Sequence, residues 1–101
     1  MNVENFKRVL DHIKAHPETW NQGEWHCGTA HCFAGHAQIM SGKVSANSDG
    51  KYEDIDATYD AIDFLQLTDN EACYLFSSFR KICDFESVLA NGFPYYILGD
   101  T

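Results

Sequence analysis

The feature that most constrains this chain is the spacing of its apolar residues, which recur at intervals of three and four along short segments. Such spacing places apolar side chains on one face of a helix. In the first segment, Pro17 ends the pattern because the residue before a proline is pushed out of the helical region. The sequence therefore predicts a first helix over residues 3–15. The apolar positions of that segment are Val3, Phe6, Val9, Leu10 and Ile13.

A second helix is predicted from Thr29, a suitable N-cap, to Met40, with Ser41-Gly42 as its stop. It is rich in small residues, so a neighbouring helix can approach its backbone closely. On a helical wheel, Phe33, Ala37 and Met40 mark the buried centre. Cys32 and His36 share one shoulder, and His31 points nearly the opposite way.

Three further helices follow from cap and stop residues. Asp54 is the predicted cap of a third helix, with Ile55, Tyr59, Ile62 and Leu65 on its buried face. Thr68 to Glu71 has the pattern of a capping box, and it predicts a fourth helix carrying Ala72, Leu75, Phe76 and Phe79. Asp84 is the predicted cap of the last helix, which Asn91-Gly92 ends.

These elements predict an all-α fold, a compact single domain over residues 1–101 with four to five short helices. One stretch, residues 18–28, has neither helical nor strand periodicity. It contains Trp20 and Trp25, and indoles are seldom left exposed without a binding purpose. We therefore expect an ordered loop that folds back onto the core.

The C-terminal segment 93–98 is too apolar for a solvated end. We expect it to pack into the helical core or into a homodimer contact. It contributes Tyr95 and Tyr96, which together with Trp20 and Trp25 are the candidate residues for contacts with a protein partner.

Charge excludes one class of ligand. Seven Lys and Arg residues against fifteen Asp and Glu residues give a formal net charge of −8. Binding to a phosphate backbone requires a basic face, so we expect no nucleic-acid partner.

We also expect no membrane association and a cytoplasmic location, because no apolar stretch approaches about 20 residues and the N-terminus lacks signal-peptide features. In that compartment the four cysteines are expected to be reduced.

Potential metal ligands are concentrated in residues 26–36, which hold two cysteines and three histidines. Zinc requires about four nitrogen or sulfur ligands in a tetrahedral arrangement. Cys27, Cys32, His36 and His12, or His16 in place of His12, are the set that this chain offers. No second ligand pair follows at zinc-finger spacing, so we expect no metal and a structural role for the segment. A zinc-stabilised domain is the alternative.

The same cysteines raise a further alternative, a small thiol enzyme or redox switch, because a thiol at a helix N-terminus has a lowered pKa. A Cys27–Cys32 bridge would close only a short loop and would add little stability. We identify no phosphate-binding glycine loop, nucleophile elbow or paired-carboxylate cleft. We therefore expect no enzymatic activity and assign no catalytic residues.

The run from Trp25 to Ala37, together with residues 65–68, resembles a group of small uncharacterised bacterial and phage proteins. Their signature is Cys-Gly-Thr-x-x-Cys-x-Ala-Gly, an aromatic residue and Ala, followed later by Leu-Gly-Leu-Thr. The likeness spans about half of the chain. It departs at His36, where many of those proteins have Trp, and at Gln66, where they have Gly.

The resemblance implies no activity. It suggests a bacterial or phage-encoded accessory protein that acts by binding a host protein. Together with the acidic composition, it leads us to expect a non-enzymatic interaction or regulatory module with a protein partner and without a cofactor.

Overall fold

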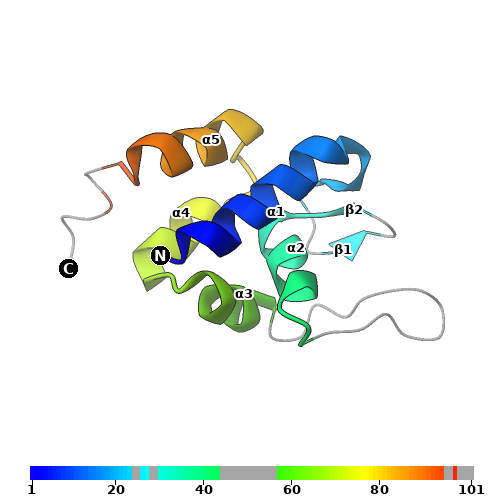
Figure 1. Cartoon of the computed structure of the whole chain (residues 1–101), viewed down its shortest axis with the longest axis horizontal. Coiled ribbons are helices and arrows are strands. Elements are labelled where there is room, and N and C mark those ends of the chain that lie inside the picture. Colours follow the sequence, from blue (N-terminus) through cyan, green and yellow to red (C-terminus); the bar gives the residue numbers. More distant parts are fainter. Residues whose placement is uncertain (24–25, 28–29, 44–56, 95–96, 98–101) are drawn as a thin grey trace.

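In the computed structural model, which describes residues 1–23, 26–27, 30–43, 57–94 and 97, the chain begins with helix α1 (Val3–Ala15) (Figure 1). Asn2 caps it, because its side-chain oxygen accepts a hydrogen bond of 2.9 Å from the Asn5 amide. The helix has the predicted bounds. It buries Phe6, Val9, Leu10 and Ile13.

The predicted loop, residues 18–28, overlaps a short 3-10 helix, η1 (Pro17–Thr19), and the first strand of a small antiparallel hairpin. Strand β1 (His26–Cys27) pairs with β2 (Ala30–His31), and His26 lies opposite His31 in the register. The backbone of residues 30–31 is therefore extended, where the sequence predicted the first turn of a helix.

The predicted start at Thr29 is wrong for this reason. Helix α2 (Phe33–Met40) begins only after the hairpin, with Cys32 as its N-cap. The Cys32 sulfur accepts a hydrogen bond of 3.3 Å from the Gly35 amide, which satisfies one of the donors that a helix start leaves unpaired. The end of the helix at Met40 is confirmed.

Helix α3 (Ala57–Leu65) buries Ala57, Ala61 and Leu65, and its predicted cap lies outside the described residues. The predicted burial of Tyr59 is wrong, since this residue is 74% exposed. Helix α3 packs on the small-residue helix α2, and close contact between two helices requires small side chains on both. The alanines therefore face α2, and the tyrosine points away.

Helix α4 (Asp69–Leu75) begins with the predicted capping box. The Thr68 hydroxyl accepts from the Glu71 amide at 3.2 Å, and the Glu71 carboxylate accepts from the Thr68 amide at 2.9 Å. The helix ends at Leu75, so the predicted continuation to Phe79 is wrong, and Phe79 is 85% exposed.

Helix α5 (Ile82–Asn91) begins two residues before the predicted cap. Asp84 occupies the third helical position and reaches back, so that its carboxylate accepts a hydrogen bond of 2.7 Å from the Lys81 amide. This is half of a capping box, which accounts for the shifted start. The predicted stop is confirmed, because Gly92 has a φ of 83°, a conformation that favours glycine.

Phe93 is half-buried and packs edge-on against Tyr74, with ring centroids 6.0 Å apart. The side-chain amide of Asn70 donates a hydrogen bond of 3.2 Å to the Ile97 carbonyl. These contacts join the described part of the C-terminal segment to α4, as the apolar composition predicted. Tyr95 and Tyr96 lie outside the described residues.

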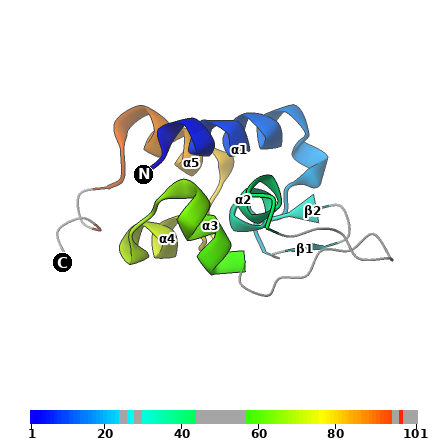
Figure 2. The same cartoon turned by 60° about the horizontal axis from the view of Figure 1, so that its bottom comes forward.

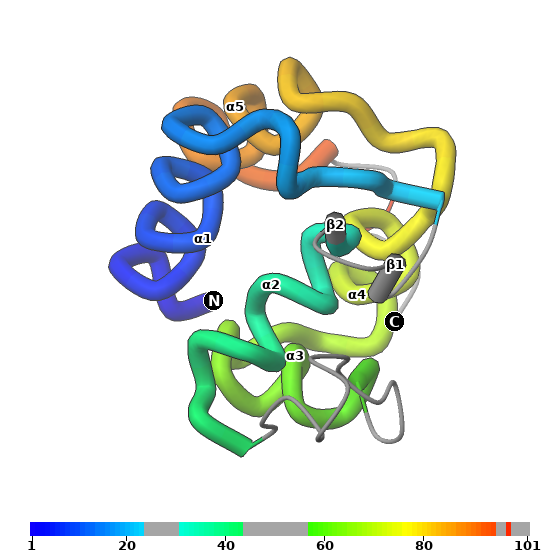
Figure 3. Tube along the Cα trace, turned by 90° about the vertical axis from the view of Figure 1, so that its right-hand side faces the viewer, coloured from blue at the N-terminus to red at the C-terminus, as the bar shows by residue number. Residues whose placement is uncertain are grey.

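The five helices enclose one hydrophobic core, in a compact all-α domain. Helices α1 and α5 form one side, and α2, α3 and α4 form the other (Figure 2). Helix α2 lies between α1 and α3 (Figure 3) and contacts both. At the centre, the ring of Phe33 stacks on Phe85 at 4.4 Å and lies 4.9 Å from Phe6. No helix within the described residues is long and apolar enough to cross a membrane.

Gln22, which is only 7% exposed, joins three parts of the chain. Its side-chain oxygen accepts hydrogen bonds from the Trp20 indole at 3.1 Å and from the Phe33 amide at 3.0 Å. Its side-chain nitrogen donates to the carbonyl oxygens of Leu75 and Ser77, both at 3.0 Å. The loop, the start of α2 and the end of α4 are therefore held together by one amide whose four bonding positions are all used.

Gln66, which follows α3, has a φ of 54° and is the one non-glycine residue with a positive φ within the described part of the chain. A side chain is disfavoured in this left-handed region, because its Cβ approaches the following carbonyl oxygen. A glycine at this position would adopt the same φ without that penalty.

Replacing Gln22 with Ala should lower the free energy of unfolding by about 2–4 kcal/mol. The Phe33 amide and the Trp20 indole would lose their acceptor, and two carbonyl groups would lose their donor. Urea denaturation measures this loss. A change below about 0.5 kcal/mol, the size expected for an exposed side chain, would contradict the role assigned to Gln22.

Replacing Gln66 with Gly should raise the free energy of unfolding by about 0.5–1 kcal/mol. Relief of the left-handed conformation outweighs the extra entropy that glycine adds to the unfolded chain. The matched control is Ala90→Gly on the exposed side of α5, which should lower stability by about 1 kcal/mol. Thermal denaturation gives the melting temperature of each variant. If both melting temperatures changed in the same direction relative to the parent protein, this interpretation would be contradicted.

Candidate functional site

Cys32 is buried and caps α2, so its thiol has a structural role. Burial raises the pKa of this thiol above its ordinary value, although the hydrogen bond from the Gly35 amide acts in the opposite direction. The thiolate is the reactive form of cysteine. Cys32 is therefore protonated at neutral pH and is a poor nucleophile.

The rings of four histidines are neighbours in a row. His12 lies in α1, His16 is the C-cap of that helix, His36 lies in α2 and His31 in β2. The ring centroids of His16 and His12 lie 5.0 Å apart, those of His12 and His36 5.5 Å, and those of His36 and His31 5.1 Å. We call these four residues the histidine row. The prediction that His31 points away from His36 is wrong, because His31 belongs to strand β2 and not to the helix.

The histidine row runs from the surface into the core. His12 and His16 are exposed, whereas His36 and His31 are buried. The Nε2–H of His36 donates a hydrogen bond of 2.8 Å to the Thr19 carbonyl, which fixes the ring against η1. At the surface end, the Nδ1 atom of His16 lies 3.7 Å from a carboxylate oxygen of Glu18.

The structure brings together only part of the zinc-ligand set considered from the sequence. His12 and His36 have adjacent rings, but the Cys32 sulfur is engaged with the Gly35 amide. The side chain of Cys27 lies outside the described residues. Among the side chains that the structure does describe, no group of three or more His, Cys, Asp or Glu residues is placed to hold a metal ion.

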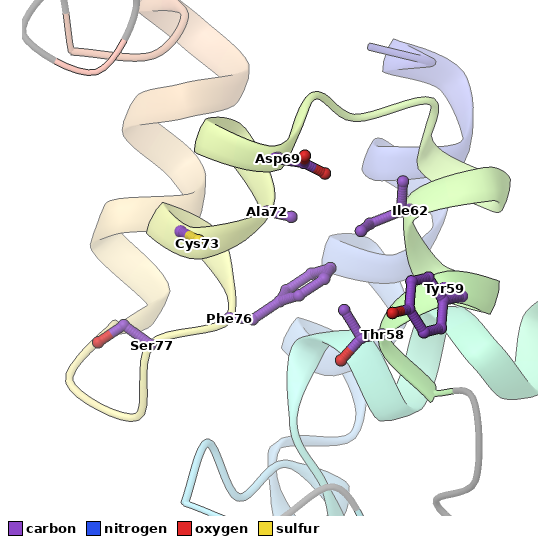
Figure 4. A pocket seen from close by; sticks show the side chains of 8 residues that line it. All are labelled: Thr58, Tyr59, Ile62, Asp69, Ala72, Cys73, Phe76 and Ser77. Carbon is purple, nitrogen blue, oxygen red and sulfur yellow. The ribbon is translucent and has the colours of Figure 1, made fainter. Parts of the chain in front are cut away.

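A second candidate site is an open groove of about 570 Å³ between α3 and α4 (Figure 4). Its apolar lining includes Ile62, Ala72 and Phe76. The exposed ring of Tyr59 stands on the α3 side, and the exposed thiol of Cys73 stands on α4. The remaining lining residues within the described chain are Thr58, Asp69 and Ser77.

Among the described residues that line this groove, the one charged side chain is that of Asp69. Asp60 and Asp63 of α3 do not line it, and they contact Gln38 and Lys43 in and after α2. Lys43 pairs with Asp63 at 2.6 Å. The guanidinium of Arg80 lies over the ring of Tyr74, 4.0 Å from its centroid. The groove therefore presents apolar surface beside negative charge.

Of the four residues predicted to contact a partner, the structure describes only Trp20. It is half-buried, its indole donates to Gln22, and its ring packs edge-on against Phe85 with centroids 6.3 Å apart. These contacts give Trp20 a role in the core. Trp25, Tyr95 and Tyr96 lie outside the described residues, and their assignment stays a prediction.

Sequence reasoning did not identify the groove. Helical spacing counted Tyr59 as a core residue, because it cannot tell which apolar positions another helix covers. Phe76, also counted as a core residue, is half-buried against the core and lines the groove as well. No local pattern in the sequence indicates which helix faces stay uncovered.

No protein-family model, no curated protein and no solved structure matches this chain.

Native-state thiol labelling should distinguish the described cysteines. Cys73 and Cys83 are exposed and should react with iodoacetamide at pH 8 within minutes, whereas the buried Cys32 should react only after denaturation. Peptide mapping by mass spectrometry gives the extent of labelling at each position. Labelling of Cys32 at the rate of Cys73 would contradict its burial and its role as a helix cap.

Proposed function

We propose that this protein is a binding module that takes up a helical segment of a partner protein in the groove between α3 and α4. The observation that carries the proposal is the open apolar groove, with Ile62, Ala72 and Phe76 in its lining. A cleft between two helices suits the apolar face of a third helix, a common mode of peptide recognition. Its volume falls within the range of ligand sites and accommodates a few side chains.

Charge supports a basic partner. The protein has a formal net charge of −8, and Asp69 stands in the groove lining itself. An amphipathic helix with Lys or Arg residues beside its apolar face would be attracted to this surface and oriented by it. The same charge opposes binding to a phosphate backbone.

The exposed aromatic residues at the groove favour a protein partner. Tyr59 lines the groove and is 74% exposed, whereas Phe79, in the turn after α4, is 85% exposed but is not a lining residue. Aromatic side chains supply much of the binding energy at protein interfaces, because they bury a large area with few rotatable bonds. Neither ring is needed to complete the core.

The chemistry of Cys32 argues against a thiol enzyme that uses this residue. Cys32 is buried, and burial raises the pKa of its thiol, so it is not an activated nucleophile. With the resemblance to small bacterial and phage proteins, these features lead us to propose a cytoplasmic accessory protein that acts on a host protein by binding.

A designed peptide tests this function. The probe is a 16-residue helix with Leu at positions i, i+3, i+4 and i+7 and Lys elsewhere, added to ¹⁵N-labelled protein. We expect chemical-shift changes centred on Thr58, Ile62, Ala72 and Phe76. The same peptide with Glu in place of Lys should bind at least about tenfold more weakly, because its charge is repelled.

Two matched variants test the location of the binding site. Cys73→Arg places a bulky cation in the groove, whereas Cys83→Arg makes the same change at an exposed cysteine on α5. We expect the first to weaken peptide binding at least about tenfold and the second to leave it nearly unchanged. Equal affinities, or shift changes away from α3 and α4, would refute the proposal. Chemical-shift changes at the groove that appear without peptide when the protein concentration is raised would indicate that a second copy of the chain binds there.

A further inference from the structure

We propose that His12 and His16 form a surface site for a borderline divalent cation such as Ni²⁺ or Zn²⁺, held by two imidazoles and completed by water. The two residues are four apart at the end of α1, both are exposed, and their ring centroids lie 5.0 Å apart. Neutral imidazole is a favoured ligand for these ions. The site is separate from the α3–α4 groove and does not depend on the function proposed for it.

The ring separation suits chelation. Metal–nitrogen bonds of about 2.0–2.1 Å with an angle of about 90–110° at the metal place two imidazole centroids roughly 4.5–5.3 Å apart. The distance between His12 and His16 falls within this range. The two rings are tilted by 46°, so only small side-chain rotations are needed to direct one nitrogen of each at a shared ion.

A neighbouring carboxylate lies close to one ring. The Nδ1 atom of His16 lies 3.7 Å from a carboxylate oxygen of Glu18, just beyond hydrogen-bond distance. Histidine ligands commonly donate their other N–H to a carboxylate, which orients the ring and makes the ligating nitrogen more basic. A small rotation of either side chain would let Glu18 accept the Nδ1–H of His16 while Nε2 binds the ion.

The electrostatic setting favours a cation. The pair lies at the C-terminal end of α1, where the carbonyl groups of the last turn carry partial negative charge. The net charge of −8 adds to this attraction. Only two protein ligands are required, in agreement with the finding that no group of three or more ligating side chains is placed for a metal within the described residues.

This site differs from the zinc site considered from the sequence. That set relied on Cys32, whose sulfur is buried and accepts from the Gly35 amide. The histidine pair uses neither cysteine of residues 26–36. Its coordination sphere stays open to water or to a donor group from another molecule.

Calorimetric titration with Ni²⁺ tests the proposal. The full-length chain carries Cys73→Ser and Cys83→Ser, because these exposed thiols would otherwise compete for the ion. We expect one ion per chain. His12→Gln and His16→Gln should each weaken binding at least about tenfold, since a two-point chelate becomes a single ligand. The double variant should show no binding at this site.

Lys14→Gln is the matched control, because Lys14 is exposed on the same last turn of α1 and carries no metal-ligating group. The affinity of this variant for Ni²⁺ should stay within about twofold of that of the parent protein. Circular dichroism of each variant verifies that the fold is retained, as expected for exposed positions. Absence of Ni²⁺ binding by the parent, or a double variant that binds as tightly as the parent, would overturn the proposal.

Discussion

The hydrogen bonds of one buried amide, Gln22, determine how the loop and two helices of this protein meet. A buried polar group is costly unless its donors and acceptors are all paired, and Gln22 uses every position. Its acceptors are the carbonyl oxygens of Leu75 and Ser77, at the point where α4 ends. One of these residues, Ser77, also lines the groove. The interior and the candidate binding surface therefore depend on the same side chain.

Much of the helical fold could be predicted because its signals are local. A capping box such as that of Thr68 and Glu71, or a glycine such as Gly92 at a helix end, acts within a few residues and leaves a recognisable pattern. Apolar spacing identified the buried face of α1 for the same reason. The exposed Tyr59 shows the limit of this method, since burial also depends on which helix packs against which face.

The buried half of the histidine row and the partners of Gln22 could not be predicted, because they depend on strand pairing and on contacts between distant segments. The four-residue spacing of His12 and His16, by contrast, is visible in the sequence. His31 faces His36 only because residues 30–31 pair as a strand, and two-residue strands have no periodicity to detect. Gln22 is one polar residue in a polar loop, and its partners lie up to 55 positions away. The positive φ of Gln66 could not be predicted either, because glutamine is not a residue that favours the left-handed region.

Hydrogen exchange at the Phe33 amide tests most directly whether Gln22 organises the structure. This amide is the donor of the 3.0 Å bond to the Gln22 side chain, and it lies at the start of α2, where amides ordinarily exchange through fraying. The account predicts that the Phe33 amide exchanges only through global unfolding, with a protection factor matching that of the Leu10 amide inside α1. If the Phe33 amide exchanged several orders of magnitude faster than the Leu10 amide, Gln22 would not have this organising role.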